Sequence, residues 1–180
     1  MVVFIYRLKA GSPAIHMIHT VKGFPMSDIE VGSPAPGFDL PRDGGGNVSL
    51  AGLAGKKVVL YFYPKDDTPG CTTEAIDFTA LSEDFAAAGA VVVGMSADPV
   101  KKHDKFIAKH NLGIILASDE DTSVLAAYGA WKEKSMYGRT YMGVERSTFL
   151  IDSDGKIARI WPKVKVKGHA QEVLDAAKAL

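Results

Sequence analysis

The sequence holds one cysteine among 180 residues. A single cysteine excludes an intrachain disulfide framework and a cysteine-rich zinc site. It agrees with a reducing compartment, so we expect a cytoplasmic protein. An excess of either charge is also absent, since Lys plus Arg and Asp plus Glu both number 21. Zero net charge argues against a nucleic-acid binder, and we expect no nucleic acid among its partners.

Long hydrophobic runs are missing as well. The apolar start at residues 2–6 is too short to span a membrane, no positive segment precedes it, and no clear secretory core follows it. We therefore expect no membrane association. Residues 1–26 contain basic side chains but no acid, and we interpret them as an N-terminal extension outside the core. They would be either a poorly ordered extension or upstream sequence before a true start at Met26, and an organelle-type targeting peptide is the alternative. The domain would then comprise residues 27–180.

Motifs for phosphate, calcium and metal binding are absent too. The glycines at 44–46 are followed by no Gly-Lys-Ser/Thr, so they predict a turn. Residues 152–155 lack the glutamate that closes a calcium loop. His103 and His110 lie seven residues apart, which predicts a solvated face of one helix and no metal site. We expect neither a metal nor an organic cofactor.

The sequence does contain a strand, a polar loop and a helix built around the cysteine. Residues 58–63, VVLYFY, form an apolar run that predicts a strand buried on both faces. Pro64 ends the run, and the polar loop 65–70 follows. Apolar residues then recur at helical spacing as far as Gly89: Ala75, Phe78, Leu81 and Phe85. This pattern places Cys71 in the first turn of a helix.

The first turn of a helix favours a thiolate, because its N–H groups are unpaired and the positive end of the helix dipole lies there. Thr68 precedes Cys71 closely, and its hydroxyl can turn back toward the sulfur. Pro64 and Pro69 stiffen the loop that carries both residues. A lone cysteine is usually a small buried hydrophobe, but this surrounding sequence indicates a cysteine that reacts.

The middle of the chain continues an alternation of strands and helices. Residues 90–95 and 114–117 are apolar runs that predict buried strands. Between them Asp98 and Pro99 form a matched start signal for a helix, with Asp98 as its cap. The order is therefore β-α-β-α-β-α up to about Gly129.

The C-terminal part ends differently. We expect residues 130–145 to form a long loop. Residues 147–151 and 157–161 flank a turn and predict a β-hairpin. Apolar spacing at residues 173–180 predicts a closing helix. A β-β-α ending after alternating elements favours an α/β domain with one mixed sheet.

The segment Pro64-x-x-x-Thr68-x-x-Cys71 resembles the active-site signature of the peroxiredoxins. The string YFYPKDDTPGCTTEA resembles their bacterioferritin-comigratory, or peroxiredoxin Q, branch. The likeness extends from about Val31 to the C-terminus and includes residues 138–152. It implies a thioredoxin-like α/β fold of three layers, with a mixed central sheet and helices on both faces. A monomer or weak homodimer is implied as well.

The resemblance also implies a thiol peroxidase that reduces hydrogen peroxide and organic hydroperoxides. The Cys71 thiolate would attack the O–O bond and become a sulfenic acid. The leaving oxygen gains negative charge, so the site needs hydrogen-bond donors. Candidates are the Thr68 hydroxyl and the N–H groups of Gly70 and Cys71. Arg146 matches the arginine that peroxiredoxins use to finish such a site, and Arg139 is the second choice.

Other residues would support this chemistry. In the family, Pro64 shields the thiolate from water and fixes the loop, and Glu74 belongs to the hydrogen-bonding frame of the loop. We treat Glu74 as structural. We further expect Phe62, Trp131 and Tyr137 to line a pocket for the organic part of a peroxide.

One departure from the branch decides how the enzyme is reset. Many members carry a second cysteine five residues after the first, where this chain has Ile76. The sulfenic acid must then be resolved by an external thiol such as thioredoxin, glutaredoxin or glutathione. A non-enzymatic redox sensor or binding module on the same fold is the alternative. A thioredoxin-type oxidoreductase needs Cys-x-x-Cys, which residues 71–74 lack. A cysteine hydrolase needs a placed histidine base, for which no motif is present.

Overall fold

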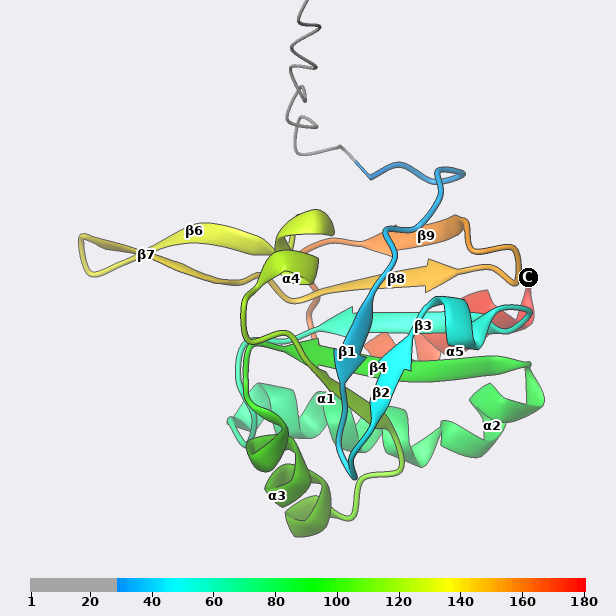
Figure 1. Ribbon diagram of the computed structural model, residues 1–180, viewed down its shortest axis with the longest axis horizontal. Coiled ribbons are helices and arrows are strands. Elements are labelled where there is room, and N and C mark those ends of the chain that lie inside the picture. Colours follow the sequence, from blue (N-terminus) through cyan, green and yellow to red (C-terminus); the bar gives the residue numbers. More distant parts are fainter. Residues whose placement is uncertain (1–28) are drawn as a thin grey trace, which may run out of the picture.

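The computed structural model describes residues 29–180, so the predicted extension at 1–26 lies outside the described residues. At its centre is a five-stranded sheet in the order β5-β4-β3-β8-β9 (Figure 1). Its strands are β3 (Lys57–Phe62), β4 (Ala90–Ser96), β5 (Ile115–Ser118), β8 (Ser147–Ile151) and β9 (Ile157–Trp161). β3, β4 and β5 run parallel, while β8 pairs antiparallel with β3 and β9 antiparallel with β8. The predicted mixed sheet is confirmed.

β3 is the middle strand of the sheet, and its side chains are buried on both faces. Val59 and Tyr61 join the apolar cluster on one side of the sheet. Val58, Leu60 and Phe62 join the cluster on the other side. All five side chains are at most 1% exposed, which explains why the run shows no polar alternation. Burying one such side chain stabilises the fold by roughly 1.5–3 kcal/mol.

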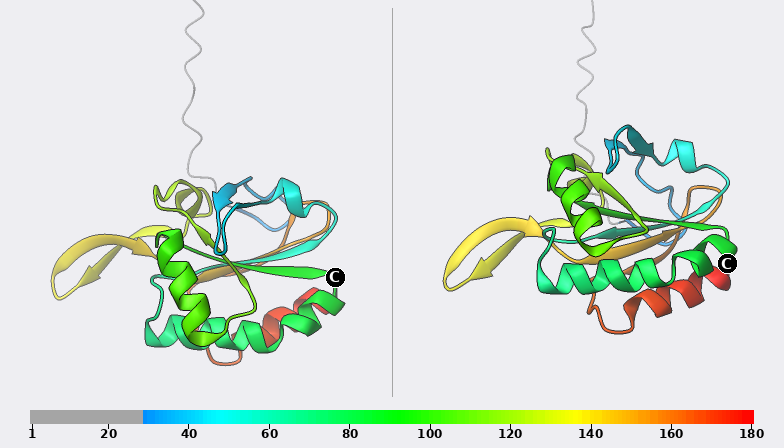
Figure 2. Two further views of the ribbon diagram at one scale, coloured as in Figure 1. Left: turned by 60° about the horizontal axis from the view of Figure 1, so that its bottom comes forward. Right: turned by 90° about the horizontal axis from the view of Figure 1, so that it is seen from below.

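Helices cover both faces of the sheet, as predicted (Figure 2). One face carries α1 (Pro69–Ala80), α2 (Ser82–Ala87) and α5 (His169–Lys178). The other carries α4 (Ser123–Ala127), the hairpin of β1 (Asp39–Pro41) and β2 (Asn47–Ser49), and a short 3-10 helix, η1 (Ala51–Leu53). α3 (Val100–His110) packs beside the edge strand β5. No helix among residues 29–180 is long and apolar enough to cross a bilayer.

Two details of the predicted helices were wrong. The helix expected to run on to Gly89 is divided at Leu81, whose backbone leaves the helical region. Asp98 does not cap α3, whose first flanking residue is Pro99. The Asp98 carboxylate instead accepts hydrogen bonds from the Asp66 N–H and the Ser96 hydroxyl. Its side chain is directed into the protein toward these donors.

The loop predicted at residues 130–145 was also wrong. Two antiparallel strands, β6 (Trp131–Met136) and β7 (Arg139–Val144), form a hairpin that projects from the body of the protein (Figure 1). Its turn is Tyr137-Gly138, and both residues have positive φ. This is the backbone of a two-residue turn whose twist suits a hairpin. A glycine between two extended segments was the signal for it.

Candidate active site

The register of the central sheet brings Arg146 and Cys71 together across 75 positions of the sequence. β8 pairs with β3 so that Ser147 lies opposite Phe62. Arg146 therefore stands where β3 ends and the loop toward Cys71 begins. The Nη2 of Arg146 donates a hydrogen bond to the Sγ of Cys71 over 3.3 Å.

Cys71 lies in the first turn of α1, as predicted, and is only 2% exposed. Thr68 is the N-cap residue, and Pro69 is the first residue of the helix. In the described part of the chain, no acceptor is bound to the N–H groups of Gly70 and Cys71. These two donors are therefore available to a molecule that reaches the sulfur.

Thr68 has a hydrogen-bonding role that the sequence did not show. Its hydroxyl donates to the backbone carbonyl of Lys65 at 2.8 Å. The Thr68 hydroxyl proton, which we predicted to donate to the leaving oxygen, is thus used within the loop. The hydroxyl oxygen still has lone pairs, so Thr68 can accept a hydrogen bond from a bound ligand.

Glu74 holds the terminal nitrogen of the guanidinium that does not contact the sulfur. Its Oε2 accepts a hydrogen bond from Nη1 of Arg146, and the side chain is 1% exposed. Burial raises the pKa of Glu74 to about 7, while the attraction of Arg146 acts in the opposite direction. Burial lowers the pKa of Arg146, but Glu74 and Cys71 outweigh it, so this pKa lies above its usual value.

Gly70 leaves room for this arrangement. A Cβ atom at Gly70 would lie 3.3 Å from Nη2 of Arg146. That distance is tighter than an ordinary van der Waals contact, so a side chain here would press on the guanidinium that faces Cys71.

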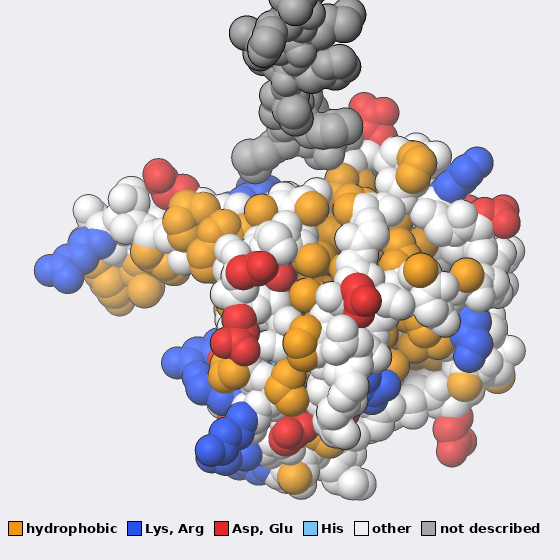
Figure 3. Space-filling view, in the orientation of Figure 1, with side chains coloured by type: hydrophobic (Ala, Val, Ile, Leu, Met, Phe, Trp, Pro, Cys, Tyr) orange, Lys and Arg blue, Asp and Glu red, His pale blue; other side chains and the backbone are white. Residues whose placement is uncertain are grey.

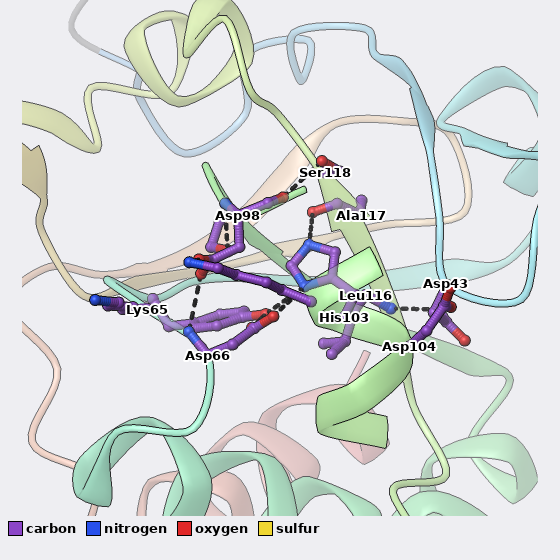
Figure 4. Close-up of polar contacts among 12 residues, drawn as sticks. Asp43, Lys65, Asp66, Asp98, His103, Asp104, Leu116, Ala117 and Ser118 are labelled. Atoms are coloured by element: carbon purple, nitrogen blue, oxygen red, sulfur yellow. Dashed lines mark hydrogen bonds and ion pairs between the residues drawn. The ribbon is translucent and has the colours of Figure 1, made fainter. Parts of the chain in front are cut away.

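A second set of polar contacts anchors the loop between β3 and α1 (Figure 4). The Tyr63 hydroxyl donates to Oδ1 of Asp66 at 2.6 Å. Nδ1 of His103, on α3, lies 2.7 Å from Oδ2 of Asp66. The Asp66 N–H donates to Oδ2 of Asp98 at 2.9 Å. The loop is thus tied to the end of β4 and to α3 before it reaches Thr68.

The Asp66–His103 contact carries one proton. Nε2 of His103 lies 3.1 Å from the carbonyl oxygen of Ala117, which only accepts, so Nε2 donates there. A hydrogen bond between Nδ1 and Asp66 needs a proton on one of the two partners. His103 is 0% exposed, so the predicted solvated position is wrong. The buried carboxyl of Asp66 holds the imidazole inside the protein.

His110 faces the same loop from nearer the surface. Its Nε2 lies 2.8 Å from Asp67, and Nζ of Lys109 lies 2.6 Å from the same carboxylate. Hydrogen bonds from Lys109 and then His110 lower the pKa of Asp67. The two histidines do share a helix face, but it faces the two loop aspartates. Two acids in the loop and two histidines on one face were the available signal.

Comparison with known proteins shows which family the chain belongs to. The AhpC/TSA family model matches residues 31–160. The chain belongs to the AhpC/TSA family. A putative peroxiredoxin bcp of Coxiella burnetii is 53% identical over 146 residues, which cover 81% of this chain and 97% of the relative. Peroxiredoxin Bcp of Bacillus subtilis is 50% identical over 150 residues, 83% of this chain and 96% of the relative.

Solved structures agree with the sequence relatives. A Xanthomonas campestris peroxiredoxin Q superposes with a TM-score of 0.78 and 46% identity, covering 86% of this chain and 98% of its own. The fold is therefore thioredoxin-like, and the protein is a thiol peroxidase of the peroxiredoxin Bcp type.

The other residues that we predicted for the site of this peroxiredoxin lie in different parts of the fold. Arg139 lies exposed on β7, and Tyr137 is 98% exposed at the tip of the hairpin. Phe62 is 0% exposed and packs against Phe149 on the face away from α1. Trp131 is half-buried at the base of the hairpin. Phe62, Trp131 and Tyr137 therefore do not line one pocket, and that expectation was wrong. Pro64 is exposed and lies just beyond Tyr63, which follows the end of β3.

Proposed function

We propose that this peroxiredoxin reduces hydroperoxides at Cys71 and that an external thiol then restores the cysteine. The observation that carries the proposal is the contact between the Arg146 guanidinium and the sulfur. Arg146 donates to Sγ at 3.3 Å while Glu74 holds its other terminal nitrogen. A fixed, permanently charged donor beside a buried sulfur favours the thiolate, which is the reacting form.

The first step transfers one oxygen atom to sulfur. The Cys71 thiolate attacks the peroxide, an S–O bond forms, and the O–O bond breaks. Its electron pair stays on the leaving oxygen, which takes up a proton to give water or an alcohol. Arg146 and the N–H groups of Gly70 and Cys71 stabilise the charge that develops there. The Thr68 oxygen accepts a hydrogen bond from the bound peroxide, which helps to orient it.

The substrate class follows from the same site. Hydrogen peroxide and organic hydroperoxides share the O–O bond that this arrangement would polarise. A Xanthomonas campestris bacterioferritin comigratory protein, 46% identical and with a TM-score of 0.78, was studied for alkyl peroxide reduction activity. We extend that substrate class to this chain. Pro64, next to the end of β3, would restrict water at the sulfur.

An external thiol must complete the cycle. The chain has no second cysteine. Ile76, which is 45% exposed on α1, stands where many members of the branch have that cysteine. Thioredoxin, glutaredoxin and glutathione are the candidate reductants. We propose a monomer or weak homodimer that works in the cytoplasm. The missing second cysteine also keeps one alternative in view, a redox sensor that oxidises once without turnover.

Consumption of hydrogen peroxide tests the proposal. Purified protein is assayed alone and with dithiothreitol, beside Cys71→Ser. We expect continuous consumption with the thiol and none above background in the variant. Consumption of one equivalent without turnover would favour the sensor. A Cys71→Ser variant as active as the parent would contradict the proposal outright.

A further inference from the structure

A cavity of about 530 Å³ lies beside the catalytic loop. Its lining comes from two elements, the loop and helix α3: Lys65, Asp66, Asp67, Thr68, Lys102, Lys105, Phe106 and Lys109. Small-molecule sites have volumes of roughly 300–1,000 Å³. The cavity is therefore large enough for a small organic ligand. Its position puts Thr68, which lies just before α1, in the wall.

The cavity carries an excess of positive charge. Both of its acids are already engaged, Asp66 by Tyr63 and His103, and Asp67 by Lys109 and His110. Lys102 is paired with Asp98 at 3.3 Å. Among residues 29–180, Lys65 and Lys105 have no ion-pair partner.

Several basic side chains lie over the α3 side of the molecule (Figure 3). Two unpaired ammonium groups on one cavity favour an anionic ligand. Phe106 also belongs to the cavity lining.

We propose that this cavity binds the carboxylates of a low-molecular-weight thiol that resolves oxidised Cys71. The inference rests on the proposed function, because the chain has no second cysteine and the reducing thiol must come from outside. Thr68 lines the cavity. Its backbone carbonyl oxygen also accepts a hydrogen bond from the N–H of Thr72, in the first turn of α1 that holds Cys71. A carboxylate held by these lysines would therefore bring the thiol of a small molecule close to the turn that holds Cys71.

The chemistry consumes two thiols for each peroxide. The first thiol attacks the Cys71 sulfenic acid, an S–S bond forms, and the S–OH oxygen leaves as water. A second thiolate then attacks the external sulfur of this mixed disulfide. The Cys71 thiolate leaves, and the external disulfide is released. Lys65 and Lys105 would hold the carboxylates of the first thiol while its sulfur reacts.

A series of thiols that differ in charge tests this site. Hydrogen peroxide is the only oxidant, so every charge effect comes from the thiol. The reductants are dithiothreitol, which is neutral, cysteamine, which is cationic, and two thiols with carboxylates, mercaptosuccinate and glutathione. The measured quantity is kcat/KM for each thiol, expressed as its ratio to kcat/KM for dithiothreitol. The proteins are the parent chain, the double variant K65Q/K105Q and the control K101Q, whose lysine lies on α3 outside the cavity lining.

We expect the ratio for mercaptosuccinate and glutathione to fall about tenfold in K65Q/K105Q and to stay unchanged in K101Q. The same ratio in the parent chain should fall as salt is added, since screening weakens these contacts. The unreactive probe S-methylglutathione should compete with glutathione in the parent chain and lose this effect in the double variant.

An unchanged ratio in K65Q/K105Q would overturn the assignment, even if glutathione is a good reductant. A ratio that falls equally in K101Q would also overturn it, because the effect would then reflect overall charge. Failure of the proposed function looks different, since the parent chain would then turn over with none of the thiols.

Discussion

The catalytic loop and the β6–β7 hairpin are built in opposite ways. Residues 64–68 of the loop contain no strand or helix. The loop is nevertheless fixed through Asp66, whose backbone and side chain both bind buried partners. The hairpin has two regular strands with a complete register. Its outer side chains are nevertheless exposed, at 56% for Met136 and 98% for Tyr137.

The difference shows what holds a functional group in place here. Regular backbone pairing gives the hairpin a shape, but only its base, at Trp131 and Val144, joins the apolar core. Buried polar contacts give the loop one position, because breaking them would leave charged or polar groups without partners inside the protein. Variants that remove a contact at the loop should therefore affect activity, and matched variants on the hairpin should not.

The largest expected effect is on the rate of Cys71 oxidation. Arg146→Met removes the donor at Sγ, and we expect the second-order rate constant with hydrogen peroxide to fall about 100-fold. The matched control is Arg139→Met on the hairpin, which should leave the rate unchanged. Stopped-flow measurement of a single turnover compares the two. A slow Arg139→Met protein beside a fast Arg146→Met protein would reverse our assignment.

The next effect concerns the anchor of the loop. His103→Asn breaks the buried contact with Asp66, and we expect the free energy of unfolding to fall by about 3 kcal/mol. The rate with peroxide should fall about tenfold, because the loop is no longer held in one geometry. Urea unfolding and single-turnover kinetics measure the two quantities.

His110→Asn is the matched control for the anchor. His110 lies on the same face of α3 as His103, but it binds the more exposed loop residue Asp67. The double variant D66N/H103N replaces both the carboxyl and the imidazole of the contact and should recover part of the lost rate and stability. Equal losses in His103→Asn and His110→Asn would show that burial of the contact is not what matters.

An effect of similar size should appear in the pH dependence of stability. Burial raises the pKa of Glu74 from its usual value of about 4.5 to about 7 in the folded protein, so the folded protein holds this proton more tightly than the unfolded chain. The stabilisation is complete below about pH 4.5 and is lost as the pH rises to about 7, a change of about 3 kcal/mol. Glu74→Gln should remove this slope.

His169 has the opposite slope, because burial lowers its pKa to about 4. Its stabilisation is complete above about pH 6.5 and is lost as the pH falls toward 4. The difference between the parent chain and Glu74→Gln cancels this contribution, since both contain His169. A difference that does not change between pH 4.5 and 7 would contradict the assignment to Glu74.

The smallest effect is expected at the tip of the hairpin. Tyr137→Ser removes an aromatic ring that contacts solvent, so the free energy of unfolding should change by less than about 0.5 kcal/mol. Its peroxide preference should match that of the parent chain, as should that of Trp131→Ala. A changed preference for organic hydroperoxides in either variant would place the hairpin at the substrate site after all.

The sequence predicted those features that depend on local pattern and on a fixed motif. β3 was evident from its unbroken apolar run, and the place of Cys71 at the start of α1 followed from the proline-rich loop and the helical spacing after it. Arg146 came from the family likeness. The register of β8 on β3 then explained why it reaches the sulfur.

The errors arose where a side chain's partner lies far away in the sequence. Asp98 and His103 have the spacing of a helix cap and a solvated face, and only the folded chain shows that both serve the catalytic loop. The hairpin was missed because its strands carry little apolar alternation, and the Tyr137-Gly138 turn alone did not outweigh that. Local pattern could not show which polar residues are buried.

The most direct test of the account is the intact mass of the protein after one equivalent of hydrogen peroxide, measured before and after addition of a thiol. We predict a gain of one oxygen atom at Cys71, followed by its loss when the thiol is added. The Arg146→Met protein should gain the oxygen more slowly. A parent chain that gains no oxygen at Cys71, or one whose oxygen the thiol does not remove, would contradict a peroxidase that is reset by an external thiol.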